Sequence, residues 1–203
     1  MSKQSYLETA RLRLRPRERK DLDTIVEMDL DPDVYRYCEL SANVHTAPPT
    51  RDVLRKRLRG EILSGSQRVW IIEWKNRSGL LGLVGLNPES PGVIGLPFYE
   101  GANFLGFRLI KDAWGQGIGT EAASAVLGYG FRILEYPMIA AFSHRENRQS
   151  YRVLEKIGME QRGRILVPQK TVLTVNNMSS PCNVYVYHRL DRGTYCARAS
   201  EAA

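Results

Sequence analysis

The stretch WGQGIGTEA, residues 114–122, places three glycines within five residues and then runs into a segment with helical periodicity. Glycine gives up more backbone freedom on folding than any other residue, so three so close together need a structural reason. Before them, NFLGFRLI at residues 103–110 has the composition of a strand. After them, residues 120–134 carry two apolar stripes, which predict a buried central helix. The glycines therefore form a turn from a strand into a helix.

A turn of this kind is suited to binding an anion. The N–H groups in the first turn of a helix have no partner within the helix, and the positive end of the helix dipole lies at the same place. Without side chains, the backbone can wrap closely around a pyrophosphate. A β-branched side chain at Gly119 is expected to enter the space of the phosphates. A tight glycine turn that binds no ligand is the structural alternative.

Two other nucleotide-binding motifs were compared with this stretch. The Walker loop, GxxxxGK[ST], is excluded because no lysine follows the glycines. Residues 117–122 fit the Rossmann pattern GxGxxA, but they lie past the middle of the chain behind an apparent β-hairpin. The next strand also ends in Ser143, His144 and Arg145, where that fold needs an acidic residue. The context therefore does not favour a dinucleotide-binding reductase, which is kept as an alternative.

The whole chain bounds the class of protein. Its 203 residues suit a single domain, predicted over residues 1–190, with a flexible tail at 191–203. No apolar run approaches the roughly 20 residues of a membrane span, and the N-terminus lacks a signal-peptide core. Three scattered cysteines without metal-ligand spacing predict a cytoplasmic protein with no disulfide framework and no metal site. The net charge of +7 indicates an anionic partner without identifying it.

The remaining elements follow from hydrophobic periodicity. In ARLRLRPRERKD, residues 10–21, leucines alternate with arginines, which favours a half-buried strand over a nucleic-acid-binding arm. Residues 21–38 predict an amphipathic helix with an acidic face from Asp21 to Asp33; a calcium loop fails because Val34 and Leu40 replace the required Gly and Glu. The full order, β-α-α-β-β-β-α-β-α-β-β, predicts an α/β (α+β) fold with a mixed, mostly antiparallel sheet flanked by helices.

Three segments together resemble the GNAT superfamily of N-acetyltransferases. They are LETARLRLRPRERKDLDTIVEM (residues 7–28), FRLIKDAWGQGIGTEAA (107–123) and HRENRQSYRVLEKIGM (144–159). The resemblance spans residues 7–190 and is closest to the RimJ/RimL type, which acetylates the N-termini of ribosomal proteins. Members of that type commonly carry Trp where this chain has Trp114. The resemblance implies the GNAT fold, with the same order of elements.

The resemblance also implies which residues hold the cosubstrate, acetyl-CoA. The backbone of the glycine turn would bind its pyrophosphate, with Gly115 shaping the turn, through residues Gln116, Gly117, Ile118, Gly119 and Thr120. Leu109, on the strand before the turn, would pair its backbone with the pantetheine arm. Asn147 and Ser150, one helical turn apart, would face the same cosubstrate. Simple N-capping of the helix is a compatible second role for Asn147.

The chemistry of amide formation indicates which further groups are needed. The acceptor amine must be neutral to attack a thioester, so a carboxylate or histidine must take its proton, directly or through water. A backbone N–H on the cofactor strand could stabilise the developing oxyanion. Ser150 is the candidate acid for the departing thiolate, because Leu154 stands where many relatives have Tyr; packing of Ser150 between helix and sheet is the alternative. Glu100, Glu73 and His144 are the candidate bases.

The predicted function is therefore acetyl-CoA-dependent N-acetylation by direct transfer to a primary amine. The expected acceptor is the N-terminal α-amine of a protein or peptide, such as a ribosomal protein, which the acidic run from Asp21 to Asp33 would attract. An ordinary solvated helix face is the alternative reading of that run. The alternative functions are acetylation of a small-molecule amine (polyamine, antibiotic or amino acid) and non-catalytic binding of CoA. A monomer or homodimer is expected, without membrane or nucleic-acid partners.

Overall fold

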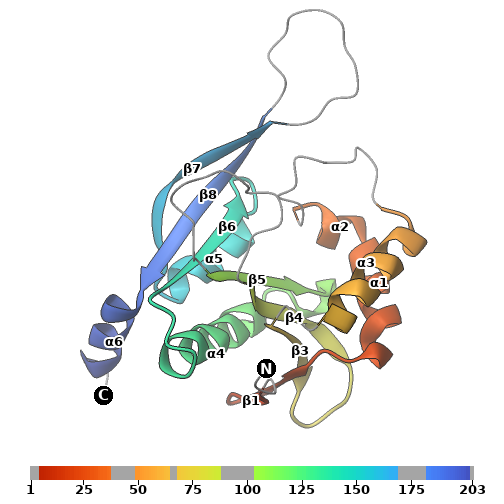
Figure 1. Ribbon diagram of the computed structural model, residues 1–203, viewed down its shortest axis with the longest axis horizontal. Helices are drawn as coiled ribbons and strands as arrows, with labels where there is room; N and C mark the ends of the chain where they lie inside the picture. Colours follow the sequence, from red (N-terminus) through yellow and green to blue (C-terminus); the bar gives the residue numbers. More distant parts are fainter. Residues whose placement is uncertain (1–4, 38–48, 65–67, 88–102, 169–181, 202–203) are drawn as a thin grey trace, which may run out of the picture.

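The computed structural model describes residues 5–37, 49–64, 68–87, 103–168 and 182–201 (Figure 1). Its centre is an eight-stranded sheet with the order β1-β2-β3-β4-β5-β6-β8-β7. Neighbouring strands are antiparallel except β5 and β6, which are parallel, so the predicted mixed sheet is confirmed. The strands are β1 (Leu7–Glu8), β2 (Leu12–Pro16), β3 (Arg68–Trp74), β4 (Leu80–Asn87), β5 (Asn103–Leu109), β6 (Met138–His144), β7 (Glu160–Pro168) and β8 (Cys182–Asp191).

The helices follow the predicted order with two differences. The acidic helix ends at Leu30, and a second short helix begins at Pro32, because a proline favours the first turn of a helix and breaks its interior. A further helix follows the last strand. The helices are α1 (Leu22–Leu30), α2 (Pro32–Tyr35), α3 (Arg51–Ser64), α4 (Ile118–Arg132), α5 (Arg148–Lys156) and α6 (Arg192–Glu201). No helix in the described ranges is long and apolar enough to cross a membrane.

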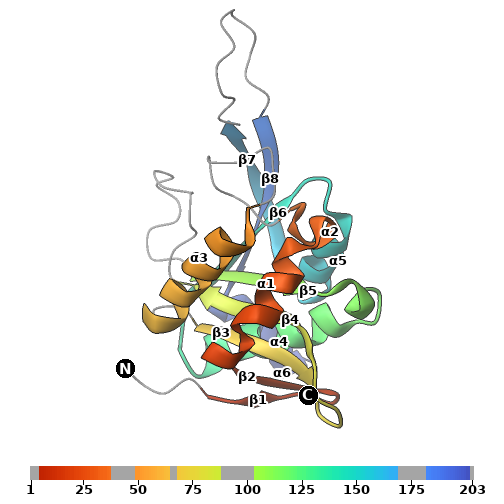
Figure 2. The same ribbon diagram turned by 90° about the vertical axis from the view of Figure 1, so that its right-hand side faces the viewer.

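Helices cover both faces of the sheet (Figures 1 and 2). On one face, Val126 and Phe131 of α4 pack with Trp70 and Ile72 of β3. On the other face, α1 and α3 pack against the alternate residues of β3, which are Val69 and Ile71. Because successive side chains of a strand point to opposite faces, a strand covered on both sides must be apolar throughout. This explains the continuous run VWII at residues 69–72.

The predicted strand near the N-terminus and the predicted central helix are both confirmed. In β2, Leu12 and Leu14 are fully buried against α4, while the arginines between them are on the opposite face. Helix α4 is buried along most of both predicted stripes, but Ile133, at the end of the second stripe, is exposed. Gly130 permits this burial, because a Cβ there would lie 2.6 Å from Ile139 Cδ1 of β6. The basic segment is thus part of the sheet.

The only parallel pair in the described sheet separates soon after it begins. Asn103 pairs with Ile139 and Phe104 with Ala140, whereas β5 continues to Leu109 and β6 to His144. Beyond these two pairs the strands diverge (Figure 1), and this interruption of the backbone pairing between β5 and β6 is called the opening of the sheet. The C-terminal end of β5 leads from this opening directly into the glycine turn.

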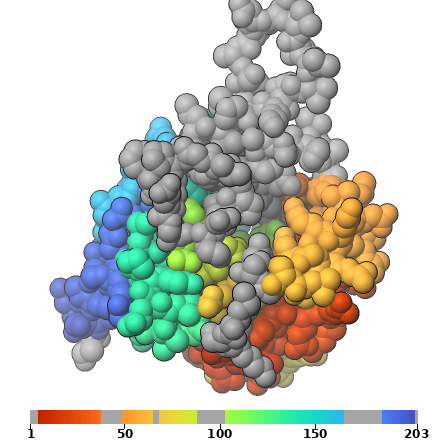
Figure 3. All heavy atoms as spheres, viewed as in Figure 1, coloured from red at the N-terminus to blue at the C-terminus, as the bar shows by residue number. Residues whose placement is uncertain are grey.

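The structure has a helix where the sequence predicted a flexible tail from residue 191. In α6, the ring of Tyr195 lies 4.9 Å from the ring of Phe131, and Arg198 donates a hydrogen bond of 2.8 Å to the carbonyl of Gly158. Figure 3 shows α6 (blue) at the edge of the molecule beside α4 (green). None of the residues of α6 is buried, so the segment has no clear apolar periodicity to signal a helix. A few long side chains hold it instead.

Candidate active site

The glycine turn adopts the conformation that its composition predicted. After a short 3₁₀ turn (Lys111–Ala113), Gly115 and Gly117 have φ of 73° and 77°, a region that residues with a side chain rarely adopt. Gly117 is the N-cap of α4 and has no side chain to accept from the first N–H groups of the helix. The indole Nε1 of Trp114 donates a 2.9 Å hydrogen bond to the Leu109 carbonyl, which fixes the turn to the end of β5. The start of α4 is therefore a preformed cluster of N–H donors.

Gly119 also has a packing role that its place in the turn did not reveal. It is buried, it has no positive φ, and a Cβ there would lie 3.4 Å from Leu109 Cδ1 and 3.6 Å from Val153 Cγ2. A side chain here would point into the protein, and its absence lets α4 approach β5 and α5 closely. A side chain at Gly119 would therefore contact Leu109 and Val153 first, and the role of its backbone in holding the pyrophosphate stays a prediction. The glycines whose backbone shape the turn requires are Gly115 and Gly117.

A network from the N-terminal strands holds the turn, and the sequence did not indicate it. Glu121, in the first turn of α4, accepts hydrogen bonds from the Thr9 hydroxyl, from Arg11 N–H (2.9 Å) and from Arg11 Nε (2.7 Å). The Arg11 guanidinium also donates to the carbonyl of Gln116 at 3.1 Å. Burial alone would raise the pKa of Glu121, but these hydrogen bonds lower it below its usual value. Glu121 therefore stays ionised and keeps Arg11 against the turn.

The backbone of β5 faces the opening between the strands at Leu109. Ile110 N–H donates to the Leu81 carbonyl of β4 at 3.0 Å, and successive residues of an antiparallel strand alternate between the two neighbours. Leu109 and Phe107 therefore direct their backbone groups away from β4, toward the side of β6. The Leu109 carbonyl already accepts from Trp114, so its N–H is the group that remains for a ligand. This geometry supports the predicted role of Leu109.

Asn147 and Ser150 lie at the start of α5, which follows the C-terminal end of β6 after a short turn. The Asn147 side chain accepts a 3.1 Å hydrogen bond from Ser150 N–H. Asn147 is therefore the N-cap of α5, the second role that the sequence predicted for it. Ser150 is half-buried, and Val153, one turn later, is the residue that approaches Gly119. Because residues three apart share a helix face, Ser150 lies on the side of α5 that faces α4.

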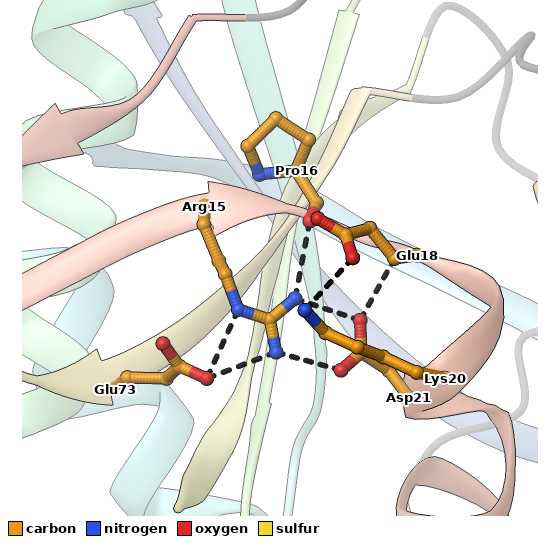
Figure 4. Close-up of polar contacts among 6 residues, drawn as sticks. All are labelled: Arg15, Pro16, Glu18, Lys20, Asp21 and Glu73. Carbon is orange, nitrogen blue, oxygen red and sulfur yellow. Dashed lines mark hydrogen bonds and ion pairs between the residues drawn. The ribbon is translucent and has the colours of Figure 1, made fainter. Parts of the chain in front are cut away.

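Glu73, one of the three candidate bases, belongs to a structural ion-pair network (Figure 4). Arg15 donates to Glu73 at 3.0 Å and to both oxygens of Asp21, at 2.6 and 2.8 Å. Burial would raise the pKa of Asp21, but the hydrogen bonds from Arg15 and Glu18 N–H lower it overall. The hydrogen bond to Asp21 raises the pKa of Arg15, so its charge is permanent. Glu73 is held by this arginine and is not available as a base.

The other two candidate bases remain predictions. His144 lies between two aromatic rings, stacked on Tyr37 and edge-on to Tyr185, each at 5.3 Å. By the alternation of β6 it is on the face opposite α4 and α5, since Ala141 packs toward those helices and Phe142 does not. Glu100 lies outside the described residues.

Comparison with known proteins decides the family. Residues 11–160 match the family described as the acetyltransferase (GNAT) domain. The chain belongs to the GNAT acetyltransferases. The uncharacterized protein YkkB of Bacillus subtilis (strain 168) is 32% identical over 160 residues, covering 78% of this chain and 87% of YkkB. The spermidine N(1)-acetyltransferase of Escherichia coli (strain K12) is 24% identical over 156 residues, covering 76% of each chain.

Solved structures show the same fold. A GNAT acetyltransferase from Bacillus anthracis matches with a TM-score of 0.72 and 23% identity, covering 93% of this chain and 99% of the other. The spermidine N-acetyltransferase of Vibrio cholerae, solved with CoA and spermine, matches with a TM-score of 0.67 and 19% identity over the same shares. The GNAT enzyme described here is thus an N-acetyltransferase that uses acetyl-CoA. The uncapped α4 N-terminus and the opening beside β5 fit that cosubstrate.

The acidic run of this GNAT enzyme is not a free negative surface. Each of its six acidic residues has a cationic or backbone partner among the described residues, as follows: Asp21 with Arg15, Asp23 with Arg55, Glu27 with Arg51, Asp29 with Arg57 and Arg108, Asp31 with Asp33 N–H, and Asp33 with Lys111. Five of the six carboxylates are therefore paired with a cation, and the run carries less unpaired negative charge than its sequence suggests. The predicted attraction of a basic acceptor stays a prediction, although most of these carboxylates are paired with cations on α3, β2, β5 and the turn before α4.

Proposed function

We propose that this GNAT enzyme acetylates the N-terminal α-amine of a protein or peptide, as the RimJ/RimL type does. One observation carries this choice over a polyamine: every acidic residue from Asp21 to Asp33 already has a partner. A polycation binds best to surplus negative charge, whereas a peptide N-terminus presents one amine next to a carbonyl. We further propose that residues 1–190 form one acetyltransferase domain, with α6 packed against it, in the cytoplasm.

Each residue of the site would have a separate role in binding the cosubstrate or in transferring the acetyl group. Acetyl-CoA supplies the acetyl group as a thioester. The backbone N–H groups from Gln116 to Thr120 would hold the pyrophosphate at the positive end of α4, and Leu109 N–H would pair with the pantetheine arm. Asn147 fixes the first turn of α5 and so positions Ser150. The attacking nitrogen forms the new bond to the carbonyl carbon as the carbon–sulfur bond breaks, and the Ser150 hydroxyl would give a proton to the departing sulfur.

The nitrogen must lose its proton before or during attack. Glu100 is the proposed group that takes this proton, directly or through water, because Glu73 is held by Arg15. His144 is the second candidate for the base. It lies on the face of the sheet opposite α4, the helix proposed to bind acetyl-CoA. Variants Glu100→Gln and His144→Phe separate the two, because loss of the true base lowers kcat most at low pH.

Spermidine is the second candidate acceptor. It is favoured by the names of two relatives, the spermidine acetyltransferases of Escherichia coli and Vibrio cholerae. In the described part of this chain, however, the acidic side chains of α1 and α2 are neutralised.

The test is an acceptor screen that follows CoA release and confirms each product by mass spectrometry. The panel contains short peptides with free N-termini, the same peptides with blocked N-termini, spermidine, aminoglycosides and free amino acids. We expect the highest kcat/KM for a free peptide N-terminus, with a weak dependence on salt because no net charge on α1 steers the acceptor. A higher kcat/KM for spermidine would refute the proposed acceptor. Binding of acetyl-CoA without CoA release for any amine would instead indicate a non-catalytic CoA-binding domain.

A further inference from the structure

The face of the sheet opposite α4 and α5 has a floor without side chains at its centre. Gly106 of β5 is exposed, although β5 is an inner strand, and no atom lies within 4 Å of where its Cβ would be. Its antiparallel partner on β4 is also a glycine, Gly85, but that glycine is buried against Val69 of β3, so the floor is Gly106 itself. Gly106 is two residues beyond Phe104, the last residue of β5 that pairs with β6. This floor therefore borders the opening through which the thioester would be reached.

Arg108 flanks the floor on one side. It is two residues after Gly106, so the two share a face of β5, and the leucines and Phe107 of that strand point to the opposite face. The Arg108 side chain is 26% exposed, and its Nε lies 3.4 Å from Oδ1 of Asp29 on α1. Asp29 is fully buried. A partly exposed guanidinium thus lies beside the floor, in an ion pair without a hydrogen bond to a carboxylate that has no access to solvent.

The cluster around Asp29 has a cationic balance. Arg57 of α3 approaches the second Asp29 oxygen at 3.8 Å, and Arg17 pairs with Glu61 at 3.0 Å nearby. Burial raises the pKa of Asp29, and Arg108 and Arg57 oppose this rise. Three arginines therefore stand against two carboxylates in this cluster. A second positive charge on an acceptor would be repelled here.

Aromatic rings flank the floor on the other side. Phe104 of β5 stacks on Phe142 of β6 at 5.1 Å, and Phe142 lies 5.6 Å from Tyr187 of β8. Phe104 and Arg108 are thus on either side of Gly106 along one strand. A ligand on this floor would have an apolar contact at one end and a guanidinium at the other.

We propose that Arg108 selects acceptors that carry an oxygen next to the amine, by donating hydrogen bonds to that carbonyl or carboxylate. Asp29 acts as a positioning residue that holds the guanidinium in place. A peptide N-terminus or an α-amino acid has such an oxygen, whereas spermidine has none and carries further positive charges. The inference rests on the proposed acetyl transfer to an α-amine and names the residue that would recognise this class.

The test compares two acceptors that differ by one group, phenylalanine amide and 2-phenylethylamine. Both have the same ring and a primary amine, but only the first has a carbonyl beside it. The two amines differ in basicity, so the informative quantity is the change caused by Arg108→Gln for each. This ratio cancels intrinsic reactivity. We expect kcat/KM for phenylalanine amide to fall about ten- to a hundredfold, and that for 2-phenylethylamine to change less than about threefold.

Three further variants sharpen the result. Arg108→Lys keeps the charge but loses the planar pair of donors, so it should restore only part of the discrimination. Asp29→Asn should raise KM for phenylalanine amide more than it lowers kcat, because the guanidinium is present but no longer held. Arg55→Gln is the matched control, since Arg55 also pairs with an acidic residue of α1, Asp23, at 3.1 Å. It should leave both acceptors unaffected.

The outcomes are distinct. An equal loss for both acceptors in Arg108→Gln, with a normal unfolding temperature and normal acetyl-CoA affinity, overturns the selective role of Arg108. Wild-type preference for spermidine over phenylalanine amide also overturns it and leaves acetyl transfer intact. If Arg108→Gln does not fold, Arg108→Lys decides, and undiminished discrimination by a folded lysine variant with unchanged KM overturns the donor geometry. Absence of CoA release with every amine refutes the proposed function itself.

Discussion

The two faces of the central sheet are built in different ways. On the side of α4 and α5, the proposed pyrophosphate site comes from one stretch, residues 114–120, and its donors are backbone N–H groups. On the side of α1 and α3, the proposed acceptor floor is assembled from Gly106, Arg108, Asp29 and Phe104, with Phe142 from a separate strand. A site made by backbone shape depends on a few glycines, whereas a site made by side chains depends on how distant elements pack. The predictions below test this difference.

The largest effect is expected from a side chain at Gly117. Gly117→Val forces a β-branched residue to a φ of 77°, so the turn must change shape and its N–H groups lose their common direction. Each charge-assisted hydrogen bond contributes about 1.5–3 kcal/mol, so the Kd for acetyl-CoA should rise at least about a hundredfold. Calorimetry on the folded variant measures it.

Gly158→Val is the matched control for that variant. Gly158 also has a positive φ, 85°, but it follows the C-terminal end of α5, and its carbonyl accepts a hydrogen bond from Arg198 of α6. Both variants should unfold at a lower temperature than wild type, and only Gly117→Val should lose acetyl-CoA affinity. If both bind acetyl-CoA normally, the turn does not hold the pyrophosphate.

The next effect concerns the start of α5. If the Ser150 hydroxyl gives its proton to the departing sulfur, Ser150→Ala should lower kcat about ten- to a hundredfold, near the low end of general-acid effects, because a thiolate is already a fair leaving group. The Kd for acetyl-CoA should stay within about threefold. Ser150→Thr keeps the hydroxyl and should retain more activity. An unchanged kcat, with acetyl transfer shown to limit the rate, assigns Ser150 to packing.

The sequence predicted the backbone-built face far better than the side-chain-built one. The glycine turn, the buried helix after it and Asn147 could be identified, because their signals lie within one local stretch. The packing role of Gly119 could not be predicted, because the spacing of glycines does not tell which ones have a positive φ and which ones allow close packing. The contact of Arg11 with the turn joins residues 105 positions apart, which no local pattern records.

The acceptor face shows the same limit more strongly. The acidic run was expected to be a free surface, yet its partners come from β2, α3, β5 and the segment before α4. Only the packing of these elements brings the cations to the carboxylates. Glu73 was considered as a base for the same reason, since its contact with Arg15 arises from strand pairing between β2 and β3. Charge in a sequence therefore predicts a surface poorly until the pairing is known.

A smaller effect is expected from Arg11, the side chain that reaches the backbone-built site. Arg11→Gln removes the ion pair to Glu121 and the hydrogen bond to the Gln116 carbonyl, so the Kd for acetyl-CoA should rise roughly three- to tenfold. Arg13→Gln is a close control, because the two side chains are 46% and 47% exposed and Arg13 pairs only weakly with Glu8 at 3.5 Å. Equal affinities in both variants would mean that the turn holds its shape without Arg11.

The smallest expected effect is on the pH dependence of the protein's stability, which should differ between a buried group on one face of the sheet and one on the other. His188 of β8 is fully buried beneath α5, edge-on to Tyr151, and burial lowers its pKa. The unfolded chain then binds the proton more readily, so this contribution to stability is complete above the unfolded pKa of about 6.5 and is lost as pH falls below it. The loss is at most about 1.4 kcal/mol per pH unit.

Asp29, on the acceptor face, has a raised pKa, so the effect of its burial on stability has the opposite sign and becomes less costly as pH falls. His188→Phe should therefore lose less stability between pH 7.5 and pH 5.5 than wild type, whereas Asp29→Asn should lose at least as much as wild type. Denaturant unfolding at both pH values measures this, and an unchanged pH dependence in His188→Phe would show that the imidazole gains solvent or a partner when it is protonated.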